Sequence, residues 1–141
     1  MSETFAPDAV AILIPVEVTG PARTYRFEFV VDTGATRTVM RPALLARLGY
    51  DLTASGRSVA MRSVTGGGTA RLVTVLQLEA LDLVRTNFEL IAHELPAAVT
   101  VDGLLGLDFF RGHVLQIDLV RGKIDVDPEK QKPRLWWRFW R

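Results

Sequence analysis

Cysteine is absent from the 141 residues, and histidine occurs only at His93 and His113. Without cysteine, the chain can form no disulfide framework, no thiolate metal site and no cysteine nucleophile. Two histidines are too few for a histidine-rich zinc site. Neither lies in a serine or cysteine partner pattern, so we expect both at the surface or in hydrogen bonds. Carboxylates are therefore the best candidates for chemistry.

Long hydrophobic runs are also missing, because no stretch of about 18 uninterrupted apolar residues could cross a membrane. Ala9–Val18 is apolar, but Glu3 and Asp8 precede it where a secretion signal needs lysine or arginine. Glu17 also interrupts this run. We therefore expect a cytoplasmic protein.

At 141 residues, the chain has the size of one domain and is too short for a two-lobed enzyme. A hydrophobic content of 48% and a charged content of 23% are typical of a folded globular protein. The net charge of +1 hides an asymmetry, because residues 129–141 hold five basic residues and one acidic residue, or +4. The other 128 residues sum to −3, which argues against a nucleic-acid surface. We expect a domain at 1–127 and a basic aromatic tail at 128–141.

Hydrophobic alternation predicts β-strands over most of the domain. The expected strands are Ala11–Val18, Thr24–Val31, Arg57–Val64, Thr69–Glu79, Thr86–His93, Val114–Asp118 and Lys123–Val126. Between the third and fourth lies Thr65-Gly66-Gly67-Gly68, which predicts a hairpin with a glycine tip. Short helices are expected at Pro42–Leu48 and at Asp108–Arg111, the latter capped by Asp108. The sequence thus predicts an all-β barrel with one or two short helices.

Asp32 is the main candidate for chemistry, because it follows an apolar strand and precedes a turn of small residues. A bare Asp-Thr-Gly is more often a simple turn. Here, however, a glycine-containing hairpin follows, and then Gly103-Leu104-Leu105-Gly106-Leu107-Asp108-Phe109-Phe110. This ordered set favours a functional site.

With Val31-Asp32-Thr33-Gly34-Ala35-Thr36, the glycine hairpin and Leu104-Leu105-Gly106, the chain resembles the retropepsin-like aspartic proteases, the single-domain relatives of pepsin. The Leu-Leu-Gly-Leu-Asp-Phe-Phe form is similar to bacterial and other cellular members. The resemblance covers residues 10–127 and implies a closed β-barrel with a flap hairpin.

Catalysis of this kind needs two carboxylates facing one water, and this chain has one Asp-Thr-Gly. The resemblance therefore implies a homodimer in which each chain supplies a catalytic Asp32. Two carboxylates roughly 3 Å apart share one proton, so one acts as a base on the water and the other as an acid. The implied activity is that of an aspartic endopeptidase on peptides or proteins, without a metal or other cofactor.

The resemblance also implies roles for neighbouring residues. In the active-site loop of Asp32, Thr33, Gly34, Ala35 and Thr36, the N–H of Gly34 would hold the carboxylate. Thr33 would bond across the dimer axis, and Thr36 would brace the outer carboxylate oxygen. The flap residues Val64, Thr65, Gly66, Gly67 and Gly68 would close over an extended peptide. The supporting residues Leu104, Leu105 and Gly106 would pack beneath the loop.

Asp102 and Asp108 are alternative sources of a second carboxylate. We expect Asp102-Gly103 to form a turn and Asp108 to cap a helix instead.

The tail holds all three tryptophans, Trp136, Trp137 and Trp140, among arginines. Our first interpretation is that it docks on its own domain or on the dimer mate. The second is a peripheral membrane contact through these tryptophans. A third is occupation of the cleft or recognition of a partner.

A rival to the enzyme is a catalytically inactive dimerisation or peptide-binding module on the same fold, with membrane association through its tail. The intact Asp32, Thr33 and Gly34 favour the enzyme.

Overall fold

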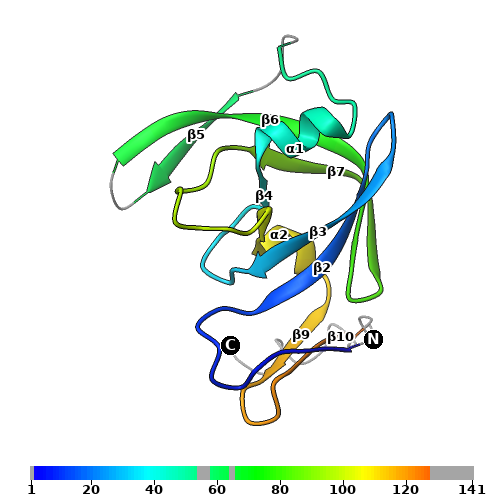
Figure 1. Ribbon diagram of the computed structural model, residues 1–141, viewed down its shortest axis with the longest axis vertical. Helices are drawn as coiled ribbons and strands as arrows, with labels where there is room; N and C mark the ends of the chain where they lie inside the picture. Colours follow the sequence, from blue (N-terminus) through cyan, green and yellow to red (C-terminus); the bar gives the residue numbers. More distant parts are fainter. Residues whose placement is uncertain (1, 54–57, 64–65, 128–141) are drawn as a thin grey trace, which may run out of the picture.

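The computed structural model describes residues 2–53, 58–63 and 66–127, which form two β-sheets and two short helices. Figure 1 shows the larger sheet curled into a barrel, with the smaller sheet below it. The strands are β1 (Ser2–Thr4), β2 (Leu13–Thr19), β3 (Thr24–Val31), β4 (Val39–Met40), β5 (Ser58–Ser63), β6 (Gly66–Ala80), β7 (Leu83–Ala92), β8 (Gly103–Leu105), β9 (Val114–Asp118) and β10 (Lys123–Asp127). The helices are α1 (Pro42–Arg47) and α2 (Leu107–Phe110).

The barrel follows the order β2-β3-β8-β4-β7-β6, and pairing of β2 with β6 closes the ring. The hairpin β2–β3 has the predicted alternation, with Ile14, Val16 and Val18 buried on β2 and Phe27 and Phe29 buried on β3. Because β2 pairs with β3 on one side and with β6 on the other, it has no unpaired edge. The predicted all-β barrel with short helices is therefore confirmed.

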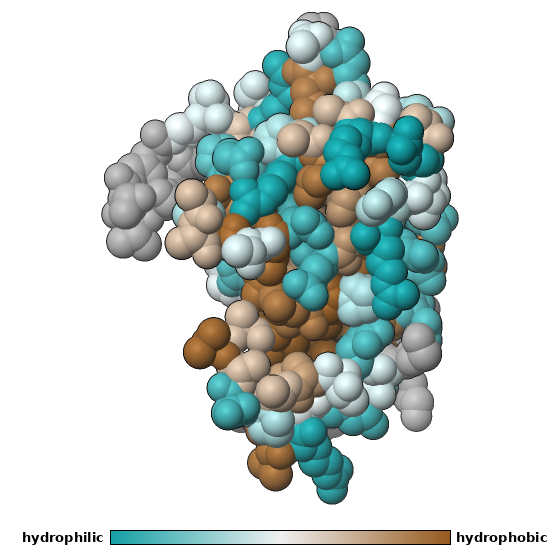
Figure 2. All heavy atoms as spheres, viewed as in Figure 1, coloured by the Kyte–Doolittle hydropathy of each residue, from teal (hydrophilic) through white to brown (hydrophobic). Residues whose placement is uncertain are grey.

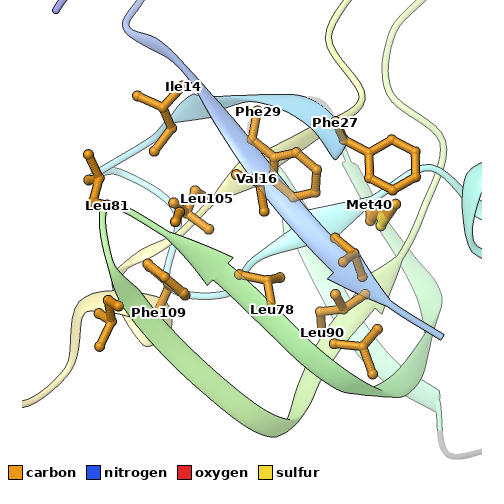
Figure 3. Close-up of a cluster of buried hydrophobic side chains, with 14 of the residues drawn as sticks. Ile14, Val16, Phe27, Phe29, Met40, Leu78, Leu81, Leu90, Leu105 and Phe109 are labelled. Atoms are coloured by element: carbon orange, nitrogen blue, oxygen red, sulfur yellow. The ribbon is translucent and has the colours of Figure 1, made fainter. Parts of the chain in front are cut away.

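The core fills the inside of this barrel. Figure 3 shows side chains from opposite walls pointing toward one another, among them Phe29, Met40, Leu78, Leu90 and Leu105. These five side chains are fully buried, and each contributes about 1.5–3 kcal/mol by leaving water. This core fixes the walls on which the loops are mounted.

The first helix, α1, begins with proline at its first turn and ends where Gly49 adopts a φ of +98°. A positive φ favours glycine, as expected for a helix end. The second helix differs from the prediction, because its cap residue is Gly106 and no side chain caps it. Asp108 is the second residue of α2, and its carboxylate accepts hydrogen bonds from Thr38.

The hairpin expected to be the flap is formed by β5 and β6, which project from the barrel (Figure 1). Its glycines are not at the tip as predicted. Gly66, Gly67 and Gly68 lie within β6 and pair with β5, in a register that places Ser63 opposite Gly66. The hydrogen bonds between paired strands come from the backbone, so glycines can take part in them as other residues do. Val64 and Thr65 lie outside the described residues.

The smaller sheet has the order β1-β10-β9, and β1 was not predicted from the sequence. Ser2 lies opposite Asp125, so the beginning of the chain is tied to its last described strand. The N–H groups of Arg121 and Val120 donate to Asp118 in the β9–β10 turn, and these hydrogen bonds lower the pKa of Asp118.

The tail at 128–141 lies outside the described residues, so its predicted roles stay predictions. Within the part of the chain that the structure describes, no helix is long and apolar enough to cross a membrane.

Candidate active site

Asp32 lies directly after β3, at a place where two parallel strands hold the backbone. Val30 lies opposite Leu104 and Val31 opposite Leu105 on β8. The N–H of Asp32 continues the ladder by donating to the carbonyl of Leu105 at 3.0 Å. The candidate catalytic residue therefore sits on a rigid base, which suits a group that must be held in one orientation.

The carboxylate of Asp32 accepts a hydrogen bond from the loop that follows it. The N–H of Gly34 donates to Asp32 Oδ1 at 3.0 Å, and the N–H of Ala35 donates to the Asp32 carbonyl at 3.1 Å. A Cβ at residue 34 would lie 3.2 Å from the same oxygen, a contact tight enough to move the carboxylate. Glycine thus permits the close approach on which this hydrogen bond depends.

The other loop residues are presented outward. Thr33, Gly34 and Thr36 are exposed, whereas Asp32 and Ala35 are half-buried. Among the hydrogen bonds that the structure describes, none joins Thr36 to Asp32. The cross-axis role of Thr33 requires a second chain, so it stays a prediction.

Thr38, which was not predicted from the sequence, lies just after the active-site loop and contacts α2. It is fully buried, and its N–H lies 3.0 Å from both carboxylate oxygens of Asp108. Its hydroxyl donates to Asp108 Oδ1 at 2.8 Å and accepts from the N–H of Gly106 at 3.1 Å. These bonds fasten the end of the active-site loop to α2. No local signal could have paired two residues 70 positions apart.

The supporting residues lie beneath this loop. Leu105 is fully buried, and Leu104 is half-buried beside Val30. Gly106 is packed against the loop so closely that a Cβ there would lie 2.6 Å from the carbonyl carbon of Arg37. The next residue, Leu107, donates its N–H to the Ala35 carbonyl at 2.9 Å.

The two alternative carboxylates have structural partners. Asp102 accepts a hydrogen bond from the N–H of Glu28 at 2.9 Å, and both oxygens of Asp108 are used by Thr38. We therefore assign both to positioning the backbone. Asp102 also precedes β8, so Gly103 begins a strand where we expected a turn.

A second, smaller apolar cluster lies beside the active-site loop. Its buried members are Val39, Ala70, Ile91, Leu95 and Val101, with Val30, Leu72, Val99 and Leu104 packed partly buried against it. In Figure 1 the active-site loop, the β5–β6 hairpin and the loop at 93–102 project on the same side of the barrel. Figure 2, in the same view, shows apolar surface between polar borders over the barrel. The arrangement provides a carboxylate next to an apolar floor.

No metal centre is formed by the residues that the structure describes, since none of their histidine, aspartate and glutamate side chains gather in groups of three. Of the candidate residues, Asp32 to Thr36 and Leu104 to Gly106 are brought together, as the hydrogen bonds above show. The glycines 66–68 are placed in the separate β5–β6 hairpin.

Comparison with known proteins agrees with this geometry. A family model described as aspartyl protease matches residues 14–109, which include the active-site loop and Leu104-Leu105-Gly106. The chain therefore belongs to the aspartyl protease family, in its retropepsin-like branch.

Among solved structures, it is similar to the crystal structure of a retropepsin-like aspartic protease from Rickettsia conorii. The TM-score is 0.68 and the identity 19%, over 91% of this chain and 89% of that chain. This likeness shows a shared fold. None of the curated proteins matches the chain.

Proposed function

We propose that the protein is a homodimeric aspartic endopeptidase in which each chain supplies one Asp32. The observation that carries the proposal is the Asp32 carboxylate, held by the N–H of Gly34 on a loop that remains accessible. The chain has one Asp-Thr-Gly loop, and its other two candidate carboxylates are engaged elsewhere. A second copy is the simplest source of a partner for Asp32, and a two-fold axis would place the two loops face to face.

The proposed chemistry follows from two adjacent carboxylates that share one proton. The ionised Asp32 removes a proton from a water molecule, whose oxygen attacks the carbonyl carbon of the peptide bond. The protonated Asp32 donates to the carbonyl oxygen. When the tetrahedral intermediate collapses, the C–N bond breaks and the leaving nitrogen takes a proton from the dyad.

An extended peptide is the proposed substrate. The β5–β6 hairpin and the loop at 93–102 project on the side of the active-site loop (Figure 1), and backbone groups can bind an added strand. The adjoining floor contains half-buried Val30, Val99 and Leu104. This supports a preference for apolar side chains next to the cleaved bond.

A peptide-library digest tests the proposal, with D32N as the inactive variant and D8N at the exposed Asp8 as the matched control. We expect the wild type and D8N to cut the same peptides and D32N to cut none. Equal cutting by D32N would refute Asp32 as the catalytic residue. No cutting by the wild type between acidic and neutral pH would refute the enzyme and leave the inactive peptide-binding module as the remaining candidate.

Sedimentation tests the shared dyad separately. We expect about twice the chain mass of 15.7 kDa under conditions where peptides are cut. An active monomer would rule out the dimeric mechanism while leaving the protease activity intact.

A membrane contact of the tail is a second proposal, supported by Trp136, Trp137 and Trp140 among arginines. Co-sedimentation with anionic liposomes, comparing the full chain with a W136S/W137S/W140S variant, measures it. The triple variant should remain in the supernatant, and equal pelleting of both proteins would refute the contact.

A further inference from the structure

The side chain of Arg41 makes four polar contacts with the loop at 93–102. Arg41 lies between β4 and α1, at the cap position of the helix, and makes no side-chain cap there. Its side chain turns to the loop at 93–102, and only 19% of it is exposed. A largely buried guanidinium needs partners for its N–H groups.

Those partners are carbonyls spread along the loop. Arg41 Nε donates to the Val101 carbonyl at 2.9 Å, and Nη1 donates to the Leu95 carbonyl at 3.3 Å. Nη2 donates to the Val99 carbonyl, and Nη1 also pairs with the Glu94 carboxylate. One planar group thus fixes the loop at three places, which a lysine ammonium cannot reproduce at the same positions.

The peptide group between Met40 and Arg41 holds both ends of the loop. The N–H of Arg41 donates to the Asp102 carbonyl at 3.2 Å, and the N–H of His93 donates to the Met40 carbonyl at 3.1 Å. Within residues 94–101, the N–H of Val99 donates to the Pro96 carbonyl at 2.9 Å, and the guanidinium supplies the donors for the carbonyls of Leu95, Val99 and Val101.

The loop in turn shapes the apolar floor beside Asp32. Leu95 and Val101 are buried in the smaller apolar cluster, and Val99 packs partly buried against it. In the same cluster Leu104 lies opposite Val30, two residues before Asp32. A change in the course of the loop would move the wall of this floor without touching the catalytic carboxylate.

We infer that Arg41 is a positioning residue that sets the shape of the peptide-binding wall formed by residues 94–101. This inference rests on the proposed function, because it names what determines peptide binding at that site. Replacement of Arg41 should then change the affinity for substrate and the preference for substrate side chains. A contact that binds substrate and transition state equally well affects KM and not kcat, so the chemical step should change little.

The test compares R41M and R41K with R47M, the matched control at the other end of α1. Arg47 is exposed, and its guanidinium lies 5.6 Å from the centre of the Tyr25 ring, away from the loop. E94Q separates the ion pair from the carbonyl contacts, because the Glu94 side chain is 65% exposed. Amide hydrogen exchange of residues 94–101 and steady-state kinetics on a cut peptide are measured for all four variants.

For R41M, we expect exchange in residues 94–101 to rise about tenfold or more while the barrel strands keep their protection. KM should rise about tenfold with kcat changed less than about twofold, and the ranking of peptides by apolar side chain should change. R41K should not restore the wild-type values, whereas R47M and E94Q should stay close to them.

If amide exchange of residues 94–101 in R41M and R41K equals that of the wild type, Arg41 does not hold the loop. Faster exchange with unchanged KM and unchanged peptide ranking would overturn the role of the loop in binding. If R41M unfolds, R41K decides the question, because it keeps the charge and the aliphatic stem. A wild-type chain that cuts nothing would refute the proposed function and the binding role together, and the exchange data would still show whether Arg41 holds the loop.

Discussion

Thr38 and Asp108, 70 residues apart in the chain, are joined by three contacts. The N–H of Thr38 lies 3.0 Å from each carboxylate oxygen, and its hydroxyl donates to Oδ1 at 2.8 Å. The same hydroxyl accepts from the N–H of Gly106. The segment that follows the active-site loop and the turn that enters α2 are therefore one hydrogen-bonded unit.

We expect T38V to destabilise the protein by about 1–3 kcal/mol, because the isosteric methyl leaves the N–H of Gly106 and a carboxylate oxygen short of a partner. Urea unfolding followed by far-UV circular dichroism measures the change. T74V on β6, where the side chain is exposed, is the matched control. Equal stability of T38V and T74V would contradict a structural role for the Thr38 hydroxyl.

Gly106 and Gly68 should respond differently to the same added methyl group. In G106A the Cβ would lie 2.6 Å from the carbonyl carbon of Arg37, and backbone cannot move aside easily. We expect a loss of about 3 kcal/mol in the free energy of unfolding. In G68A nothing lies within 4 Å of the new Cβ, so stability should be near that of the wild type. Similar losses in both variants would refute the packing argument.

Arg85 holds the C-terminal end of α2, and R85M should loosen it. Its guanidinium donates to the Phe109 carbonyl at 2.8 and 3.0 Å and to the Arg111 carbonyl. Loss of these charge-assisted bonds should cost about 1–2 kcal/mol in thermal or urea unfolding. R26M on β3, at an exposed arginine, is the control. An R85M variant as stable as R26M would show that these carbonyls find water instead.

We expect ionisation of Tyr50 to lower the stability of the fold at alkaline pH. Its hydroxyl donates to the Thr19 carbonyl at 3.0 Å and accepts from the N–H of Leu76 at 2.9 Å. Burial raises the pKa of Tyr50 above its ordinary value of 10.0, although the bond from Leu76 acts in the opposite direction. The folded state therefore favours the protonated hydroxyl. The stabilisation is present below pH 10 and is lost as pH rises through the folded-state pKa.

Urea midpoints between pH 8 and 11 measure this effect. The wild type should lose stability more steeply above pH 10 than Y50F, which has no hydroxyl to ionise. Parallel curves for the two proteins would contradict the shift in the pKa of Tyr50.

Local pattern was sufficient for much of the fold. The alternation in Thr24–Val31 predicts β3 with its observed ends, and Pro42 with Gly49 predicts α1 to within one residue. Asp32 and Gly34 are likewise recognisable, because a strand end followed by a small-residue turn is a local feature. The strands β1, β4 and β8 escaped prediction because each has only two or three residues, too few to show a period.

The glycines 66–68 and Asp108 show why the remaining predictions failed. Glycine usually marks a turn, yet the register with β5 draws these three into a strand. Aspartate is a common helix-capping residue, yet the Asp108 carboxylate accepts a hydrogen bond from Thr38, which lies in a distant segment of the chain. The glycines were drawn into a strand by pairing within their own hairpin, whereas Asp108 found a partner 70 positions away, which one sequence does not reveal.

By itself the sequence determined that the chain is rich in β-strands, has one Asp-Thr-Gly and contains no cysteine, because these features depend on composition and near neighbours. Only the tertiary structure decided how Asp32 is held, since the parallel pairing of β3 with β8 joins residues more than 70 positions apart. It also decided the partners of Thr38 and Arg41, because a buried hydroxyl or guanidinium bonds to the carbonyls and carboxylates that folding brings within hydrogen-bond distance.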